Sequence, residues 1–104
     1  MRRIGSKMKL LPGFTQEYKR RHDAIWPELK ELLSSTGLHD YSIFLDEETN
    51  SLFAYFTVSD EKNLDNVPAH PVMKKWWTFM KDIMETNPDH SPVNIPLQEV
   101  FYMA

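Results

Sequence analysis

The spacing of apolar residues changes repeatedly along the chain, and the order of these changes limits the fold more than any other feature. Apolar and polar residues alternate from Ile4 to Leu10, which predicts a β-strand. From Phe14 to Leu33 apolar residues recur every three or four positions, which predicts a helix. Pro27 lies inside this pattern, and because proline removes a backbone donor we expect the helix to kink or restart there.

The rest of the chain shows strand spacing twice, helix spacing once and strand spacing again. Two alternating segments flank a polar turn, so they predict a β-hairpin. A second helix is expected to begin at Pro71, since proline suits the first helical position. A loop with three prolines then leads to a final strand. The segments are Asp40–Asp46, Ser51–Val58, the helix with its apolar stripe at Val72, Trp76, Phe79, Met80, Ile83 and Met84, the loop Asn87–Pro96 and the strand Leu97–Tyr102.

The order strand, helix, strand, strand, helix, strand predicts an α+β protein with a ferredoxin-like sheet, βαββαβ, and helices on one face. A chain of 104 residues fits a single domain, 1–104. The opposite face of such a sheet would expose apolar side chains. Pairing of two copies through their sheets, as a homodimer, is the simplest way to cover it.

Charge and composition exclude several classes of function. Lys and Arg number 12 against 15 Asp and Glu, a net charge of −3, so nucleic acid and anionic membranes are not expected partners. The chain has no Cys, which excludes disulfides and thiolate chemistry. No apolar run approaches the ~18 residues of a membrane span. No apolar core of a signal peptide follows Arg2 and Arg3, so we expect a cytoplasmic protein.

Tyr18 and His22 are the first candidates for chemistry. They are four residues apart on the predicted helix, so a phenol and an imidazole face the same side. Imidazole titrates near ~6.5 and can give or accept a proton at neutral pH. The competing interpretation is that His22 is a hydrogen-bonded core residue with Tyr18 as its partner.

Tyr41, Trp76 and Trp77 are the next candidates, as a binding surface for a sugar. Neighbouring helical positions point about 100° apart, so the two indoles cannot both occupy the centre of one stripe. An aromatic ring can stack on the apolar face of a sugar while phenol and imidazole bind its hydroxyls. Both tryptophans could equally belong to the core or to a dimer interface.

The sequence offers no pattern for a metal or a nucleotide cofactor. Its histidines, His22, His39, His70 and His90, are scattered and none lies at the spacing of a known metal motif. With only 3 Gly and no glycine-rich phosphate loop, a nucleotide has no evident binding motif. We therefore expect no metal and no cofactor.

Four segments together resemble the L-rhamnose mutarotase family over essentially the whole chain. They are EYKRRHDAIWPEL at Glu17–Leu29, KKWWTFM around Trp76 and Trp77, NPDHSP at Asn87–Pro92 and LQEVFY at Leu97–Tyr102. The resemblance implies a dimeric α/β barrel that interconverts the α and β anomers of L-rhamnose in the bacterial cytoplasm.

By motif, the resemblance implies that His22 is the catalytic proton donor and that Tyr18, Tyr41, Trp76 and Trp77 bind the sugar. Asp23 and Ala24 depart from the residues common in the family, beside the catalytic position. Opening a hemiacetal needs an acid at the ring oxygen and a base at the anomeric hydroxyl, without a redox step. The base is open between Tyr41, a water and a main-chain carbonyl.

Two other classes of function fit the same architecture. The barrel also serves cofactor-free monooxygenases and modules that bind haem or other ligands, in which His22 could be an axial ligand. A coloured preparation with a Soret band would favour haem. A dimerisation module without activity would show no exchange of anomers.

Overall fold

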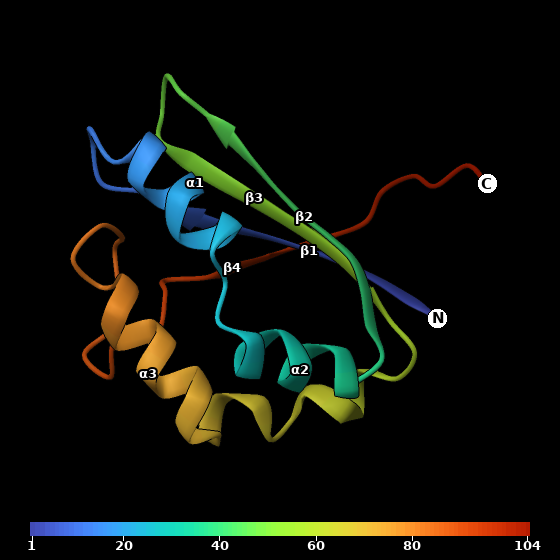
Figure 1. Cartoon of the computed structure of the whole chain (residues 1–104). Helices are drawn as coiled ribbons and strands as arrows, with labels where there is room; N and C mark the ends of the chain where they lie inside the picture. Colours follow the sequence, from blue (N-terminus) through green and yellow to red (C-terminus); the bar gives the residue numbers. More distant parts are fainter.

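The computed structural model describes residues 1–104, and it contains the predicted elements in the predicted order (Figure 1). Short 3-10 turns, η1 and η2, precede the last helix. The elements are β1 (Arg2–Lys9), α1 (Thr15–Asp23), α2 (Pro27–Ser35), β2 (Leu38–Asp46), β3 (Ser51–Val58), η1 (Glu61–Leu64), η2 (Val67–Ala69), α3 (Pro71–Met80) and β4 (Ile95–Leu97).

The four strands form one antiparallel sheet in the order β2-β3-β1-β4. This is the strand order of a ferredoxin-like sheet, so the predicted fold class is confirmed. All three α-helices lie on the same side of the sheet (Figure 1). None of these helices is long and apolar enough to cross a membrane.

The first predicted helix is interrupted before Pro27, as its sequence indicates. Trp26 is extended, with φ −61° and ψ 133°, and Pro27 occupies the start of α2. The helical segment ends after α2, where the chain turns towards β2 at Gly37, which has φ +83°. A Cβ there would meet the Ser59 hydroxyl, which would have to move, and the positive φ by itself already favours glycine.

The core lies between the helices and the inner face of the sheet. Leu10, Leu29, Leu52 and Met80 are almost completely buried there, and they come from four different segments. The predicted stripe of the last helix is only partly correct, because α3 ends at Met80 while the buried Ile83 and Met84 follow it. Met84 instead pairs with Leu10 in an isolated β-bridge. Phe79, also placed in that stripe, is 40% exposed.

The prediction of a final strand at Leu97–Tyr102 is wrong. Only Ile95–Leu97 pair with β1, and the chain beyond has no strand structure. Side chains hold this segment instead, because the Arg3 guanidinium donates two hydrogen bonds to Glu99 and lies 3.4 Å from the Tyr102 ring centre. In Figure 1 the segment after β4 leads away from the helices to the C-terminus.

The outer face of the sheet carries no helix and exposes several apolar side chains, with Lys7 of β1 lying between Phe53 and Ile95. Directly opposed residues of antiparallel strands share a face, and the register places five apolar side chains on this one. Each is at least 37% exposed. They are Phe44, Phe53, Tyr55, Ile95 and Leu97.

Arg21 connects α1 to the chain segment at the end of α3. Its guanidinium forms two hydrogen bonds with Asp82, one with Glu17 and one with the Phe79 carbonyl oxygen. The side chain is only 10% exposed, and it lies 4.5 Å from the Phe79 ring centre. A nearly buried guanidinium with this many acceptors fixes the position of α1 relative to α3.

The ion pairs of Glu17 give a pH-dependent contribution to stability. Hydrogen bonds from Arg20 and then Arg21 lower the pKa of Glu17 from its ordinary 4.5 to about 2. A carboxyl with a lowered pKa stabilises the fold above its unfolded pKa and loses this contribution as the pH falls towards the folded value. We therefore expect Glu17→Gln to lower Tm at neutral pH, by a difference that shrinks between about pH 4.5 and pH 2.

Thermal unfolding followed by circular dichroism across this pH range measures the difference. Glu31→Gln is the matched control, since Glu31 is an exposed carboxylate on α2 that forms no ion pair. A Tm difference for Glu17→Gln that is the same at every pH would contradict the prediction.

Candidate active site

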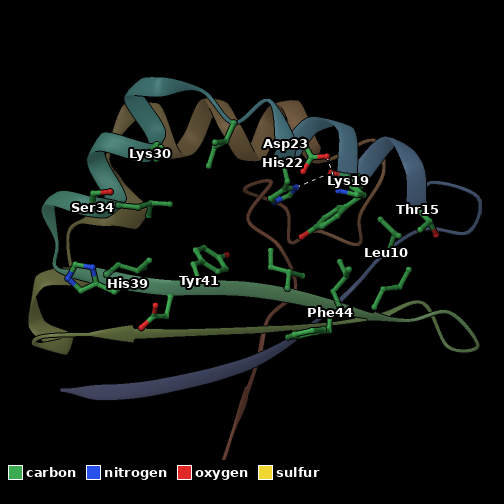
Figure 2. Close-up of a pocket in the computed structure, with 18 residues that line it drawn as sticks. Leu10, Thr15, Lys19, His22, Asp23, Lys30, Ser34, His39, Tyr41 and Phe44 are labelled. Atoms are coloured by element: carbon green, nitrogen blue, oxygen red, sulfur yellow. Dashed lines mark hydrogen bonds and ion pairs between the residues drawn. The ribbon is translucent and has the colours of Figure 1, made fainter.

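A hollow of about 650 Å³ lies between the first two helices and the edge strand β2. Figure 2 shows His22 pointing into it from α1, and Tyr41 pointing towards the helices from β2. Tyr18 lines the same hollow. Three of the five predicted site residues therefore share one cavity, although the sequence separates Tyr41 from His22 by a whole helix.

Tyr18 and His22 are stacked on the inner side of α1. Their ring centres are 4.2 Å apart with 27° between the ring planes, as their spacing of one helical turn predicts. Tyr18 is almost buried, and burial raises the pKa of its phenol. Its hydroxyl forms no hydrogen bond within the chain, yet no fully buried polar side-chain atom lacks a partner. The hydroxyl therefore stays accessible from the cavity.

His22 has one ring nitrogen engaged and one available. Its Nδ1 lies 3.1 Å from the Tyr18 carbonyl oxygen, which can only accept, so Nδ1 must donate its hydrogen. The other nitrogen, Nε2, has no hydrogen bond within the chain. Burial lowers the pKa of His22, against a smaller opposing effect of the hydrogen bond to Tyr18. At neutral pH the imidazole is therefore mostly neutral, with a lone pair on Nε2.

Tyr41 owes its position to an irregularity in β2. The pairing with β3 shifts between His39 and Ser42, and Asp40 has φ +53°. Such a bulge changes the direction of a strand's side chains, and bulges occur frequently beside active sites. The Tyr41 ring lies 5.6 Å from that of Phe56, and 45% of the residue remains exposed. Its phenol can therefore contact a ligand in the hollow.

Trp76 supports His22 from behind and lines neither of the two hollows in this region. Its ring meets the His22 ring edge-on at 5.4 Å and the Trp26 ring edge-on at 5.1 Å. Trp76 is only 6% exposed. The indole of Trp76 therefore packs against the catalytic candidate, which is the role of a supporting core residue.

Trp77 lines a second hollow of about 660 Å³, together with Tyr41. This hollow lies between α3, β1 and the segment that leads to β4. Because Tyr41 lines both hollows, the two hollows adjoin at this residue. The structure thus brings Tyr18 and His22 together on one side of Tyr41, and Trp77 on the other.

Sequence reasoning missed several residues around these hollows. Trp26, which packs on Trp76, was given no role of its own in the motif at Glu17–Leu29. Lys74, Asp89 and Asn94 line the second hollow with Trp77. The NPDHSP motif was the one available signal for Asp89, but it carries no role by spacing alone. No group of three or more His, Asp or Glu side chains is arranged to hold a metal ion.

The arrangement is suited to moving protons on a small polyhydroxylated ligand. Nε2 of His22 can give or take a proton, while the raised pKa of Tyr18 keeps its phenol protonated at neutral pH. Trp77 offers an aromatic face in the adjoining hollow, which Tyr41 also lines. These are the elements of a site for acid–base chemistry on a sugar.

Comparison with known proteins identifies close relatives over the full chain. A family model described as L-rhamnose mutarotase matches residues 3–103. The L-rhamnose mutarotase of Formosa agariphila is 56% identical over 103 residues, which cover 99% of each chain. A crystal structure of L-rhamnose mutarotase from this organism matches with a TM-score of 0.93 at 55% identity, covering 100% of both chains.

A more distant likeness concerns the fold alone. A putative antibiotic biosynthesis monooxygenase from Bacteroides thetaiotaomicron matches with a TM-score of 0.56 at 17% identity, over 95% of this chain and 89% of that one. The shared architecture is the ferredoxin-like dimeric α/β barrel fold. It gives no support to a monooxygenase activity for this chain.

The different surroundings of the two neighbouring tryptophans lead to opposite expectations for their substitution. Trp76→Phe should lower the free energy of unfolding by roughly 1–3 kcal/mol, because it leaves space beside His22 and Trp26. Trp77→Phe should cost less stability and weaken binding of the sugar expected from the sequence. Chemical denaturation and calorimetric titration measure the two effects. Equal stability losses with unchanged binding in both variants would contradict this division.

Proposed function

The chain belongs to the L-rhamnose mutarotase family, and from this we infer that it interconverts the α and β anomers of L-rhamnose. It is an isomerase, as its full-length relatives are. The observation that supports a catalytic role for this site is the His22 ring, which lies at the wall of a cavity with one nitrogen fixed and the other free.

Anomer exchange needs two proton transfers around one breaking bond. An acid protonates the ring oxygen as the C1–O5 bond breaks, and the electron pair of this bond stays on the oxygen. A base takes the proton of the anomeric hydroxyl, which forms the aldehyde. Rotation about the C1–C2 bond followed by the reverse steps closes the ring as the other anomer.

We propose that Nε2 of His22 carries out the transfer at the ring oxygen. The Tyr18 carbonyl keeps the hydrogen on Nδ1 in both charge states, so only Nε2 can exchange a proton with the sugar. The imidazolium, which is the minor form of His22 at neutral pH because burial lowers its pKa, gives its proton to the ring oxygen during opening. The neutral ring takes it back during closure, because both directions pass through the same transition state.

We propose that both phenols bind the sugar as neutral hydroxyl groups. Desolvation of the phenol group raises the pKa of Tyr18, and also that of Tyr41 although its residue as a whole is partly exposed, which disfavours a tyrosinate as the base. Of the three groups left open by the sequence, this leaves a water or a main-chain carbonyl to accept the proton of the anomeric hydroxyl.

We also propose that two copies pair through the outer faces of their sheets. The exposed side chains of Phe53 and Tyr55 lie at the centre of this face, with Phe44 and Leu97 beside them. A group of large exposed apolar side chains on a sheet face without helices supports an interface at this face. The helices cover the opposite face, so pairing leaves both hollows accessible.

The first prediction of this proposal is that His22→Ala slows anomer exchange by roughly 10²- to 10⁴-fold, the loss expected when one acid–base group is removed. The α and β anomeric protons of L-rhamnose resolve in NMR spectra, so saturation of one signal and observation of the other measures exchange directly.

Added imidazole should restore part of the activity of His22→Ala, measured against imidazole without protein. Folding of the variant is verified by its circular dichroism spectrum and Tm. Full exchange by folded His22→Ala would contradict the role of His22, while absence of exchange in the wild-type protein would contradict the proposed activity itself.

The dimer proposal predicts a mass in light scattering of about twice the 12.3 kDa of one chain. Phe53→Lys places a charge at the centre of the outer face and should shift the mass towards that of the monomer. Glu47→Lys, in the turn between β2 and β3, is the control of like charge away from this face. A wild-type protein that is folded and monomeric at micromolar concentration would contradict pairing.

A further inference from the structure

The second hollow contains a carboxylate for which the proposed chemistry has no use. Asp89 and Lys74 line this hollow with Trp77 and Tyr41, on the far side of Tyr41 from Tyr18. Neither polar side chain forms an ion pair within the chain. An aromatic face with a carboxylate beside it is a combination that can bind a sugar, because the ring covers C–H groups and the carboxylate accepts from hydroxyls.

The carboxylate of Asp89 is held in one orientation. Its Oδ1 accepts hydrogen bonds from the backbone N–H of Ser91 at 3.0 Å and from the Ser91 hydroxyl at 2.5 Å. These bonds lower the pKa of Asp89, so the group is ionised at neutral pH. Its Oδ2 forms no hydrogen bond within the chain. One oxygen is therefore fixed by the loop and the other is available to a ligand.

Two contacts within the loop that carries Asp89 and one contact to α3 hold this loop. Thr86 pairs with Pro92 in an isolated β-bridge, which closes the loop at its base. The Asn87 side chain donates to the Ser91 hydroxyl at 3.0 Å. His90 Nδ1 lies 3.3 Å from the hydroxyl oxygen of Thr78, on α3. The position of Asp89 relative to Trp77 is thus set before any ligand binds, which lowers the entropic cost of binding.

We propose that Oδ2 of Asp89 accepts a hydrogen bond from a hydroxyl on the side of the pyranose ring opposite the anomeric centre, on C3 or C4. The proposal rests on the activity inferred above, because His22 must meet the ring oxygen in the first hollow. C3 and C4 lie across the ring from O5 and C1. A sugar whose reacting edge meets His22 therefore directs these hydroxyls past Tyr41 towards Trp77 and Asp89.

Asp89 is on this account a residue that determines specificity and does not take part in proton transfer. A hydroxyl donating to a carboxylate forms a short, charge-assisted hydrogen bond. Asp89 is exposed in the free protein, so an analogue that covers this carboxylate without donating a hydroxyl would remove its water and leave it without a partner. The residue would thus distinguish L-rhamnose from sugars that differ at C3 or C4.

Asp89→Asn provides a sharp test, because asparagine keeps the Oδ1 acceptor that Ser91 uses and replaces Oδ2 by an NH₂ group. We expect the KM for L-rhamnose in the exchange assay to rise roughly 10- to 100-fold, the range for a lost hydrogen bond to a charged group. The value of kcat should change far less, since no proton transfer involves Asp89. A KM equal to that of the wild-type protein would overturn the proposal.

Two control variants separate this effect from those of charge and loop order. Asp65→Asn removes one negative charge from an exposed residue that lines neither hollow, and it should leave KM unchanged. Asn87→Ala removes the side-chain bond to Ser91 while keeping the Asp89 carboxylate. It should lower Tm and leave KM close to that of the wild-type protein. An Asn87→Ala variant that reproduces the full KM effect would assign Asp89 a purely structural role in the loop.

Deoxy sugars identify the hydroxyl. For the wild-type protein, either 3-deoxy- or 4-deoxy-L-rhamnose should bind more weakly than L-rhamnose, and Asp89→Asn should remove most of that difference. Calorimetric titration measures this binding independently of anomer exchange, so the outcome can be interpreted even where the wild-type protein shows no exchange. A difference that is equally large in both proteins would overturn the proposal while leaving the mutarotase activity intact.

Discussion

The contact of Arg21 with Glu17 and Asp82 determines how the two functional helices meet. Arg21 precedes His22 directly, and Asp82 follows the helix that carries both tryptophans. The Arg21 side chain is only 10% exposed whereas Asp82 is 61% exposed, so Glu17 and the Phe79 carbonyl oxygen are the acceptors that hold this guanidinium on its inner side. The edge-on contact between His22 and Trp76 therefore depends on this link between α1 and the end of α3.

Tyr41 shapes the site from the sheet, as Arg21 does from the helices. The bulge in β2 places its ring between two hollows, one with His22 and the other with Trp77. A regular strand would keep the alternation of side chains but would not make this local change of direction. The site thus combines two helices linked by Arg21, α1 and α3, with one strand, β2, that contains a bulge. Its shape follows from backbone geometry as much as from the identity of the side chains.

The order of strands and helices could be predicted because the spacing of apolar residues shows which side of each element is buried. Burial of these sides packs the helices onto the sheet. The pairing of Tyr18 with His22 was predictable for the same reason, as it depends on helical spacing alone. The strand predicted at Leu97–Tyr102 failed because an alternating pattern shows which residues suit a strand, whereas the Arg3 contacts that hold this segment are tertiary. Asp89 could not be recognised, since its position relative to Trp77 arises from a loop whose contacts span the chain from Thr78 to Pro92.

The inner face of the sheet carries both the core and the cavity, whereas the outer face is available for association. The inner face buries the core and, at its edge, leaves room for a polar cavity beneath α1 and α2. A protein of this size has little apolar surface to spare, so a site cut into its core weakens a small fold. Burial of the outer face against a second copy would stabilise the sheet while leaving His22 and Tyr18, which lie on the helical side, uncovered. The exposed phenylalanines and tyrosine of the outer face are thus consistent with a chain that obtains part of its stability from association, while His22 and its neighbours remain free for chemistry.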